Sequence, residues 1–154
     1  MNRMIFALLI GIALSFSGVA SAQDDPPPCG PSGQLPSELS GNVAADSRCF
    51  EIRMYTAEPA KDGKGGIDDL HSRFREGEVA LFEKLGAKVI AVWQRLDNPN
   101  TLVYMLAYRD RAHRDEVFSN FVRDPEWAEL STKFAVPIQI EAYMMSAADY
   151  STLK

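Results

Sequence analysis

The sequence contains few of the residues that most often carry metal, redox or nucleophilic chemistry. Its 154 residues include two cysteines, Cys29 and Cys49, and two histidines, His71 and His113. Neither histidine lies at ligand spacing from a cysteine, and structural zinc takes four ligands, so we expect no metal site. The sequence also has no Ser-His-Asp order and no Gly-rich phosphate loop after a strand. We therefore assign no catalytic residue and no cofactor.

Clusters of positive charge and long apolar runs are also missing from the body of the chain. Asp and Glu total 21 against 16 Lys and Arg, which gives a net charge of −5. An acidic chain without a basic patch is a poor match for nucleic acid or for anionic membrane surfaces. After residue 22 no apolar run is long enough to cross a bilayer, so we expect no stable membrane insertion of the mature protein.

Residues 1–22 have the features of a secretory signal peptide. A short basic head that ends at Arg3 precedes the apolar run MIFALLIGIAL of residues 4–14, and Ala20-Ser21-Ala22 gives the small-residue pattern of a cleavage site. The run is short for a hydrocarbon core of ~30 Å. An uncleaved N-terminal anchor is the alternative. We predict that the mature protein is periplasmic or secreted.

Residues 23–48 form a leader that is rich in proline and glycine. It includes three consecutive prolines at 26–28, Gly30-Pro31 and Gly41. Because proline removes a backbone donor and glycine is costly to order, we expect no packed helix or strand here. A disulfide between Cys29 and Cys49 would tie this leader to a folded domain over residues 49–150.

Apolar periodicity in the domain predicts an order of strand, helix, strand, strand, helix, strand. The strands are expected at residues 50–56, 88–94, 101–108 and 138–145, and a helix at 67–85. Further helical segments follow Asp110, as a cap, and Pro125, at a first helical position. This order is the split βαβ unit, which predicts an α+β, ferredoxin-like sandwich with helices on one face of the sheet.

Period-two alternation divides the strand residues into two sets. We expect the smooth aliphatic sets, such as Ile52 with Met54 and Val103 with Met105, to pack against the helices. The other set mixes aromatic and charged residues and is expected on the open face. The predicted ligand-binding residues are Arg53, Tyr55, Trp93, Tyr104, Tyr108, Glu141 and Tyr143. The face of Trp93 stays open at this point, because both faces of the strand over residues 88–94 are apolar.

An exposed face this rich in aromatic residues predicts a homodimer in which two sheets lie face to face. The space between the sheets would hold a small apolar or aromatic molecule, with Arg53 orienting its polar end. The alternative is that these residues only fill the interface. Arg53 would then serve as an ion-pair partner of Glu141.

Three further side chains are candidates for a role in chemistry. His113 follows the Asp110 cap and is either a solvated first-turn residue or a proton carrier. Trp127 is expected to pack between helix and sheet. His71 is expected to be exposed.

Several segments resemble the NIPSNAP family. Residues 50–55 (FEIRMY) resemble its first-strand pattern ELRTY, and residues 100–108 (NTLVYMLAY) resemble NTVVYLWAY. Residues 111–114 followed by 124–127 resemble LAHR and DPEW. The likeness extends over residues 50–145. Gly77 and Leu85 stand where family members often carry histidine.

The resemblance implies a dimeric α/β barrel and leaves the activity open, because the family has no settled reaction. Two functions are therefore carried forward. The first is an exported module that binds a small molecule or a partner without catalysis. The second, by analogy with other dimeric α/β barrels, is a cofactor-independent monooxygenase or isomerase.

The two cysteines give a direct test of disulfide and compartment together. An even pair in an oxidising compartment predicts one bond, against the alternatives of two free thiols or a metal site. Its loop of about 20 residues would contribute about 3 kcal/mol to stability. Thiol titration of the denatured, unreduced mature protein should find no free thiol, and finding two would contradict both the bond and the export that it implies.

Overall fold

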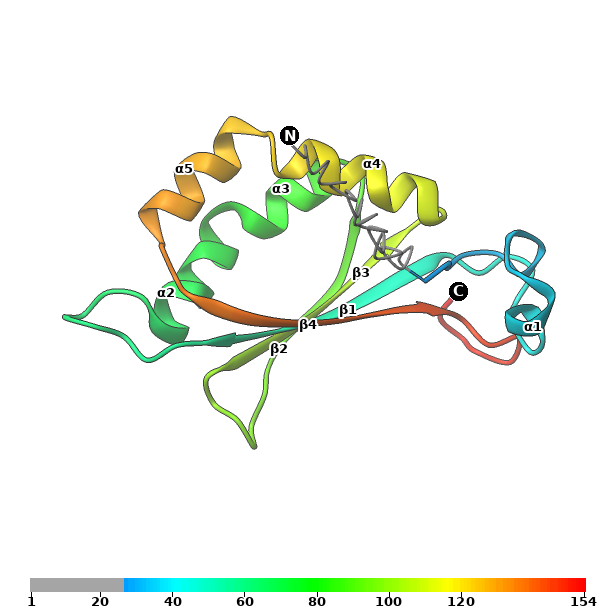
Figure 1. Ribbon diagram of the computed structural model, residues 1–154, viewed down its shortest axis with the longest axis horizontal. Helices are drawn as coiled ribbons and strands as arrows, with labels where there is room; N and C mark the ends of the chain where they lie inside the picture. Colours follow the sequence, from blue (N-terminus) through cyan, green and yellow to red (C-terminus); the bar gives the residue numbers. More distant parts are fainter. Residues whose placement is uncertain (1–26) are drawn as a thin grey trace, which may run out of the picture.

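The computed structural model describes residues 27–154, so the predicted signal peptide lies outside the described residues. A four-stranded antiparallel sheet has the order β2-β3-β1-β4. Its strands are β1 (Cys49–Ala57), β2 (Lys88–Gln94), β3 (Thr101–Tyr108) and β4 (Ile138–Ser146). The helices α2 (Gly66–Arg73), α3 (Val79–Lys84), α4 (Arg111–Phe121) and α5 (Pro125–Lys133) lie on one side of it, as Figure 1 shows. The predicted α+β, ferredoxin-like fold is confirmed.

Local sequence explains where the helices of the second half begin. The side chain of Asp110 accepts a hydrogen bond from the backbone N–H of His113 at 2.8 Å. Asp124 does the same for Glu126 at 2.8 Å, with Pro125 at the first helical position. Each cap satisfies a donor that the first helical turn leaves free. Across residues 27–154, no helix is both long and apolar enough to span a membrane.

The long helix predicted over residues 67–85 is interrupted by a π-helical turn. It runs through α2, the π-turn Phe74–Glu78 and α3. Residues five apart meet across this turn, and Arg73 Nε donates to Glu78 Oε2 at 2.7 Å. At Gly77 a Cβ atom would lie 2.6 Å from Leu130 Cδ1, so glycine lets α5 approach the π-turn closely. The π-turn and its glycine therefore place α5 over the sheet.

The leader is packed beside the end of the sheet. Cys29 and Cys49 form the predicted disulfide, with Cα atoms 4.7 Å apart. A 3₁₀ turn at Ser32–Gln34 precedes the one-turn helix α1 (Ser37–Ser40), and neither contains a buried residue, so no packed helix forms over residues 32–40. Ala44 N–H donates to the Ala147 carbonyl at 2.9 Å, so the leader also pairs with the C-terminal segment.

The main core lies between the sheet and the helices, and it contains tyrosines that we expected on the open face. Tyr55, Tyr104 and Tyr108 are almost fully buried there. Tyr104 contacts Phe74 and Phe82 of the long helix, with ring centroids 4.9 and 6.1 Å apart. The predicted open-face placement of Tyr55, Tyr104 and Tyr108, and of Arg53 beside them, is therefore wrong.

These tyrosines can be buried because their hydroxyl groups form hydrogen bonds inside the protein. Tyr104 Oη donates to Tyr55 Oη at 2.7 Å, so both rings contribute apolar area without leaving a hydroxyl unpaired. The phase predicted for β1 and β3 is wrong, because the charged and hydroxyl groups of the mixed set pair with one another inside the protein and do not need solvent. In β4 the predicted phase is right, because Ile138 and Ile140 face the helix layer beside Ala57 and Tyr55.

The open face of the sheet carries aliphatic residues and two exposed aromatic side chains. Trp93 and Tyr143 are 45% and 52% exposed there. They pair with Val103 and Ile52, which lie on the face away from the core. Glu141 also lies on this face, opposite Met54. At one end of this face, Phe50, Ala107 and Ala147 form a small second core.

Candidate functional site

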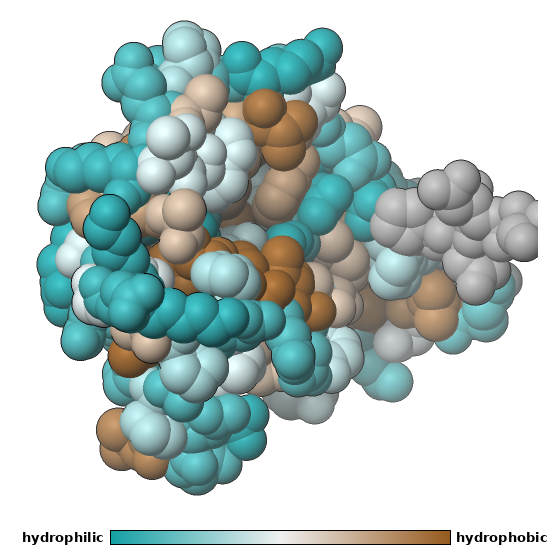
Figure 2. All heavy atoms as spheres, turned by 60° about the vertical axis from the view of Figure 1, so that its left-hand side comes forward, coloured by the Kyte–Doolittle hydropathy of each residue, from teal (hydrophilic) through white to brown (hydrophobic). Residues whose placement is uncertain are grey.

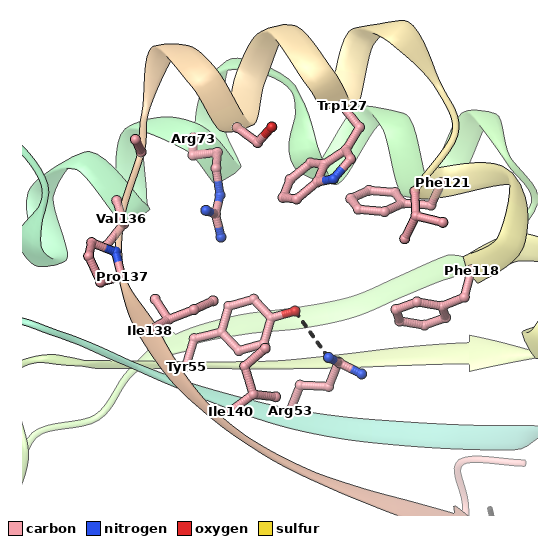
Figure 3. A pocket seen from close by; sticks show the side chains of 13 residues that line it. Arg53, Tyr55, Arg73, Phe118, Phe121, Trp127, Val136, Pro137, Ile138 and Ile140 are labelled. Carbon is pink, nitrogen blue, oxygen red and sulfur yellow. Dashed lines mark hydrogen bonds between the residues drawn. The ribbon is translucent and has the colours of Figure 1, made fainter.

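A cavity of about 610 Å³ lies between the helix-covered face of β1 and β4 and the helices α4 and α5. Figure 3 shows its walls, with Arg73 and Trp127 pointing in from the helix layer and Tyr55 and Arg53 from the sheet. Its lining residues are Arg53, Tyr55, Arg73, Phe118, Phe121, Val122, Trp127, Ser131, Ala135, Val136, Pro137, Ile138 and Ile140. The lining is mostly apolar, and its charged or hydroxyl side chains are those of Arg53, Arg73, Tyr55 and Ser131.

The cavity opens along the free edge of the sheet. β4 is the outer strand, and its Ile140 is 50% exposed. Across the mouth, Val122 in the link between α4 and α5 is 62% exposed. Figure 2 shows apolar surface gathered in a hollow that hydrophilic side chains surround. A small molecule can therefore reach the interior between α5 and the edge of β4.

Stacked aromatic rings form the roof and one end of the cavity. Trp127 lies 4.6 Å from Phe121, and Phe121 stacks on Phe82 at 4.2 Å. Phe82 belongs to the buried core, so these rings are supported from behind. Trp127 is half-buried, packs against that core as the sequence predicted, and presents the rest of its surface to the cavity. The result is a rigid apolar wall.

A chain of hydrogen bonds runs along the sheet side of the cavity. Tyr104 Oη donates to Tyr55 Oη, which also accepts from Arg53 Nε at 3.1 Å. Burial raises the pKa of Tyr55 and raises the pKa of Tyr104 further. Both phenols are therefore protonated at neutral pH, and neither supplies a base to the cavity.

Arg53 pairs with Glu51, so the expected ion pair between Arg53 and Glu141 is wrong. Arg53 Nη1 lies 2.5 Å from Glu51 Oε1, whereas Glu141 lies on the opposite face of the sheet. Glu51 is fully buried and also accepts two hydrogen bonds from Arg114, both at 2.9 Å. The Tyr108 hydroxyl is 3.4 Å from Glu51 Oε2. Burial tends to lower the pKa of Arg53, but nearby Tyr104, Tyr55 and Glu51 together raise it, so Arg53 stays charged.

Arg73, the last residue of α2, enters the cavity just before the π-turn. Its Nε is bound to Glu78, and its guanidinium lies over the Trp127 ring, 5.2 Å from the centroid. Burial raises the pKa of Glu78, and the charge of Arg73 opposes that shift. Arg73 is only 4% exposed, and its Nη2 is buried without a hydrogen-bond partner. A buried guanidinium with an unused donor is a group that can bind an anion.

The structure thus divides the predicted ligand-binding residues. Arg53 and Tyr55 line the cavity, Tyr104 supports Tyr55 from behind, and Tyr108 lies beside Glu51. On the other face of the sheet lie Trp93, Glu141 and Tyr143.

Sequence reasoning missed Glu51, Arg73, Phe118 and Phe121 as members of this site. The signal for Glu51 was present, because it shares the two-residue phase of Arg53 and Tyr55. Arg73 and Glu78 gave no such signal, since a spacing of five places them together only across a π-turn.

The two histidines lie outside the cavity lining. His113 Nδ1 accepts from the backbone N–H of Arg109 at 3.2 Å, and its ring fits against Gly86. His71 is half-buried instead of exposed, and its Nε2 lies 2.7 Å from Gln94 Oε1. Within residues 27–154, no three His, Cys, Asp or Glu side chains are grouped to hold a metal ion.

The chain is similar to proteins of one family. The NIPSNAP family model matches residues 50–151. A solved NIPSNAP family protein of unknown function from Agrobacterium tumefaciens is 20% identical with a TM-score of 0.61, covering 73% of this chain and 99% of that one. A NIPSNAP-like domain protein from Burkholderia xenovorans is 17% identical with a TM-score of 0.58, covering 69% and 90%. At these identities the likeness shows the fold alone. No curated protein is detectably similar to this sequence.

The two faces of the sheet predict opposite results for two glutamates. Glu51→Gln leaves Arg53 and Arg114 beside a neutral amide, so we expect the free energy of unfolding to fall by about 3 kcal/mol. Glu141→Gln on the open face should change it by less than about 0.5 kcal/mol. Urea denaturation measures both values, and equal effects would contradict the assignment of faces.

Proposed function

The chain belongs to the NIPSNAP family, and from this premise we propose that it binds a small apolar or aromatic molecule in the cavity between its helices and its sheet. The observation that supports this most is the cavity itself. A volume of about 610 Å³ lies in the range of about 300–1,000 Å³ that small-molecule sites occupy. An apolar lining with few convergent polar groups is also typical of such sites.

The side chains that line the cavity favour binding over catalysis, because none of those described can accept a proton at neutral pH. A monooxygenase or isomerase without a cofactor needs a proton acceptor aimed at its substrate. The described residues that line the cavity include no carboxylate and no imidazole, and Tyr55 has a raised pKa that makes it a donor. We therefore favour binding over the alternative function, a cofactor-independent monooxygenase or isomerase. Conversion of a bound molecule into a product by the purified protein would support the enzymatic alternative instead.

The two tryptophans provide a test of where a ligand binds. The chain has Trp127 in the cavity and Trp93 on the open face, so Trp93→Phe and Trp127→Phe each leave one reporter. The probe is 4-bromobenzamide, a neutral aromatic molecule whose bromine quenches nearby indole fluorescence. Saturable quenching is expected in Trp93→Phe, and only linear, non-saturable quenching in Trp127→Phe. Saturation in Trp127→Phe alone would move the site to the open face and contradict the proposal.

We further propose that a second copy of the chain covers the open face of the sheet. This face exposes Trp93 and Tyr143 over half-buried Ile52, Met54 and Met105, a composition typical of protein interfaces. A two-fold axis lets one such patch meet itself, which gives a closed homodimer. In that arrangement the ligand cavity stays inside each protomer, because it lies on the other face of the sheet.

Light scattering tests the homodimer directly. At micromolar concentration the protein should have about twice the mass of one chain, and Trp93→Glu should shift it to the monomer because a carboxylate is costly to bury. Leu39→Glu in α1, at an exposed position in the middle of the leader, introduces the same charge and should leave the dimer intact. A monomeric wild-type protein would contradict the proposal.

We also propose that the protein is exported and works in the periplasm or outside the cell. The disulfide between Cys29 and Cys49 supports this, because such bonds persist in oxidising compartments. The thiol titration given above tests the same proposal.

A further inference from the structure

We propose that the ligand of the cavity is a monocarboxylic acid with an aromatic or branched apolar body, and that Arg73 binds its carboxylate. This inference rests on the proposed function, since it assigns the chemical class of the molecule in the same cavity. It also moves the anchoring role that the sequence suggested from Arg53 to Arg73.

Arg73 has binding capacity that the protein does not use. Only its Nε is engaged, by Glu78, while Nη2 is buried and has no partner. Figure 3 shows the guanidinium pointing from the helix layer into the cavity. A buried donor without an acceptor costs free energy, and a ligand oxygen within reach would remove that cost.

Arg53, unlike Arg73, already donates hydrogen bonds within the protein from two of its nitrogen atoms. Its Nη1 is bound to Glu51 and its Nε to Tyr55, and its guanidinium packs against Phe118 at 5.0 Å from the ring centroid. It contributes positive potential to the cavity from the sheet side, and it supports the ligand site without being its principal anchor.

The charges of the ion pairs in and beside the cavity do not balance. Arg53 and Arg73 line the cavity, and the excess lies on its sheet side, where Arg53 shares Glu51 with Arg114. Three arginines, Arg53, Arg73 and Arg114, are paired with two fully buried glutamates, Glu51 and Glu78. The cluster therefore carries one excess positive charge. A single bound carboxylate would neutralise it.

The contact between Arg114 and Asp115 does not change the excess positive charge. Arg114 also touches Asp115 at 3.3 Å, but Asp115 is exposed and is shared with Arg111 at 3.1 Å. That surface pair adds one charge of each sign. The guanidinium fork matches both carboxylate and phosphate, but a phosphate dianion would overcompensate the single excess charge, whereas one carboxylate balances it.

The apolar part of the ligand is defined by the walls that face Arg73. The guanidinium lies over Trp127, which continues into Phe121, while Val136 and Ile138 line the opposite side toward β4. A ring that leaves its carboxylate at Arg73 would extend along Trp127 and bury apolar area against both walls.

Calorimetric titration of a matched pair of probes tests the inference. The probes are 4-bromobenzoate and 4-bromobenzamide, which share size and shape and differ in charge. The wild-type protein should bind the benzoate at least about tenfold more tightly, as expected for hydrogen bonds to a charged group. Arg73→Leu should remove this preference and leave the affinity for the amide within about threefold.

Two further variants control for charge and for folding. Arg75→Leu removes the same charge from an exposed position on the same helix and should keep the full preference. Arg73→Leu together with Glu78→Leu replaces the ion pair by apolar side chains, which folded proteins often tolerate, and should bind both probes equally.

The outcomes separate this inference from the proposed function. If the wild-type protein binds neither probe, the proposed function fails. If it binds both equally, or if the loss of Arg73 weakens both alike, the cavity binds small molecules but Arg73 is not a carboxylate anchor. A preference that survives in both Arg73 variants would also overturn the inference.

Discussion

The buried charge of Glu51 is the constraint around which the rest of the structure is arranged. A carboxylate with no exposed surface must be compensated inside the protein, and here Arg53 of the same strand and Arg114 of α4 do so. The pairing fixes which face of β1 turns toward the helices, and it holds α4 against that face. Every residue in the same two-residue phase then follows into the helix layer, including Tyr55, which becomes part of the cavity.

A second buried ion pair, between Arg73 and Glu78, does the equivalent work in the helix layer. It exists because the π-turn brings residues five apart into contact, and Gly77 in that turn lets Leu130 of α5 approach. The turn thereby places Arg73 above the cavity while α5 supplies Trp127 as its roof. π-turns within α-helices are frequent at functional sites, and this one positions the group that we propose as the ligand anchor.

The sheet thus separates two roles that the sequence had assigned to one surface. The helix-covered face encloses a cavity with polar anchors, while the open face presents Trp93 and Tyr143 among aliphatic side chains. Ligand binding and self-association would then use opposite sides of the same strands. A residue in β1 or β4 can affect either one, depending on the parity of its position in the strand.

The sequence by itself determined the main strands and helices, their order, the helix starts at Asp110 and Pro125, the disulfide and the family, because these depend on local chemistry and on spacing along the chain. It also supplied Arg53 and Tyr55 as site residues, although on the wrong face. Only the tertiary structure decided the phase of β1 and β3, because the set that carries Glu51 and Arg53 can be buried only when partners such as Arg114 of α4 meet it there. It alone brought Arg73 to Glu78 and Trp127, because that meeting depends on a π-turn and on the packing of α5, neither of which is encoded in a local pattern.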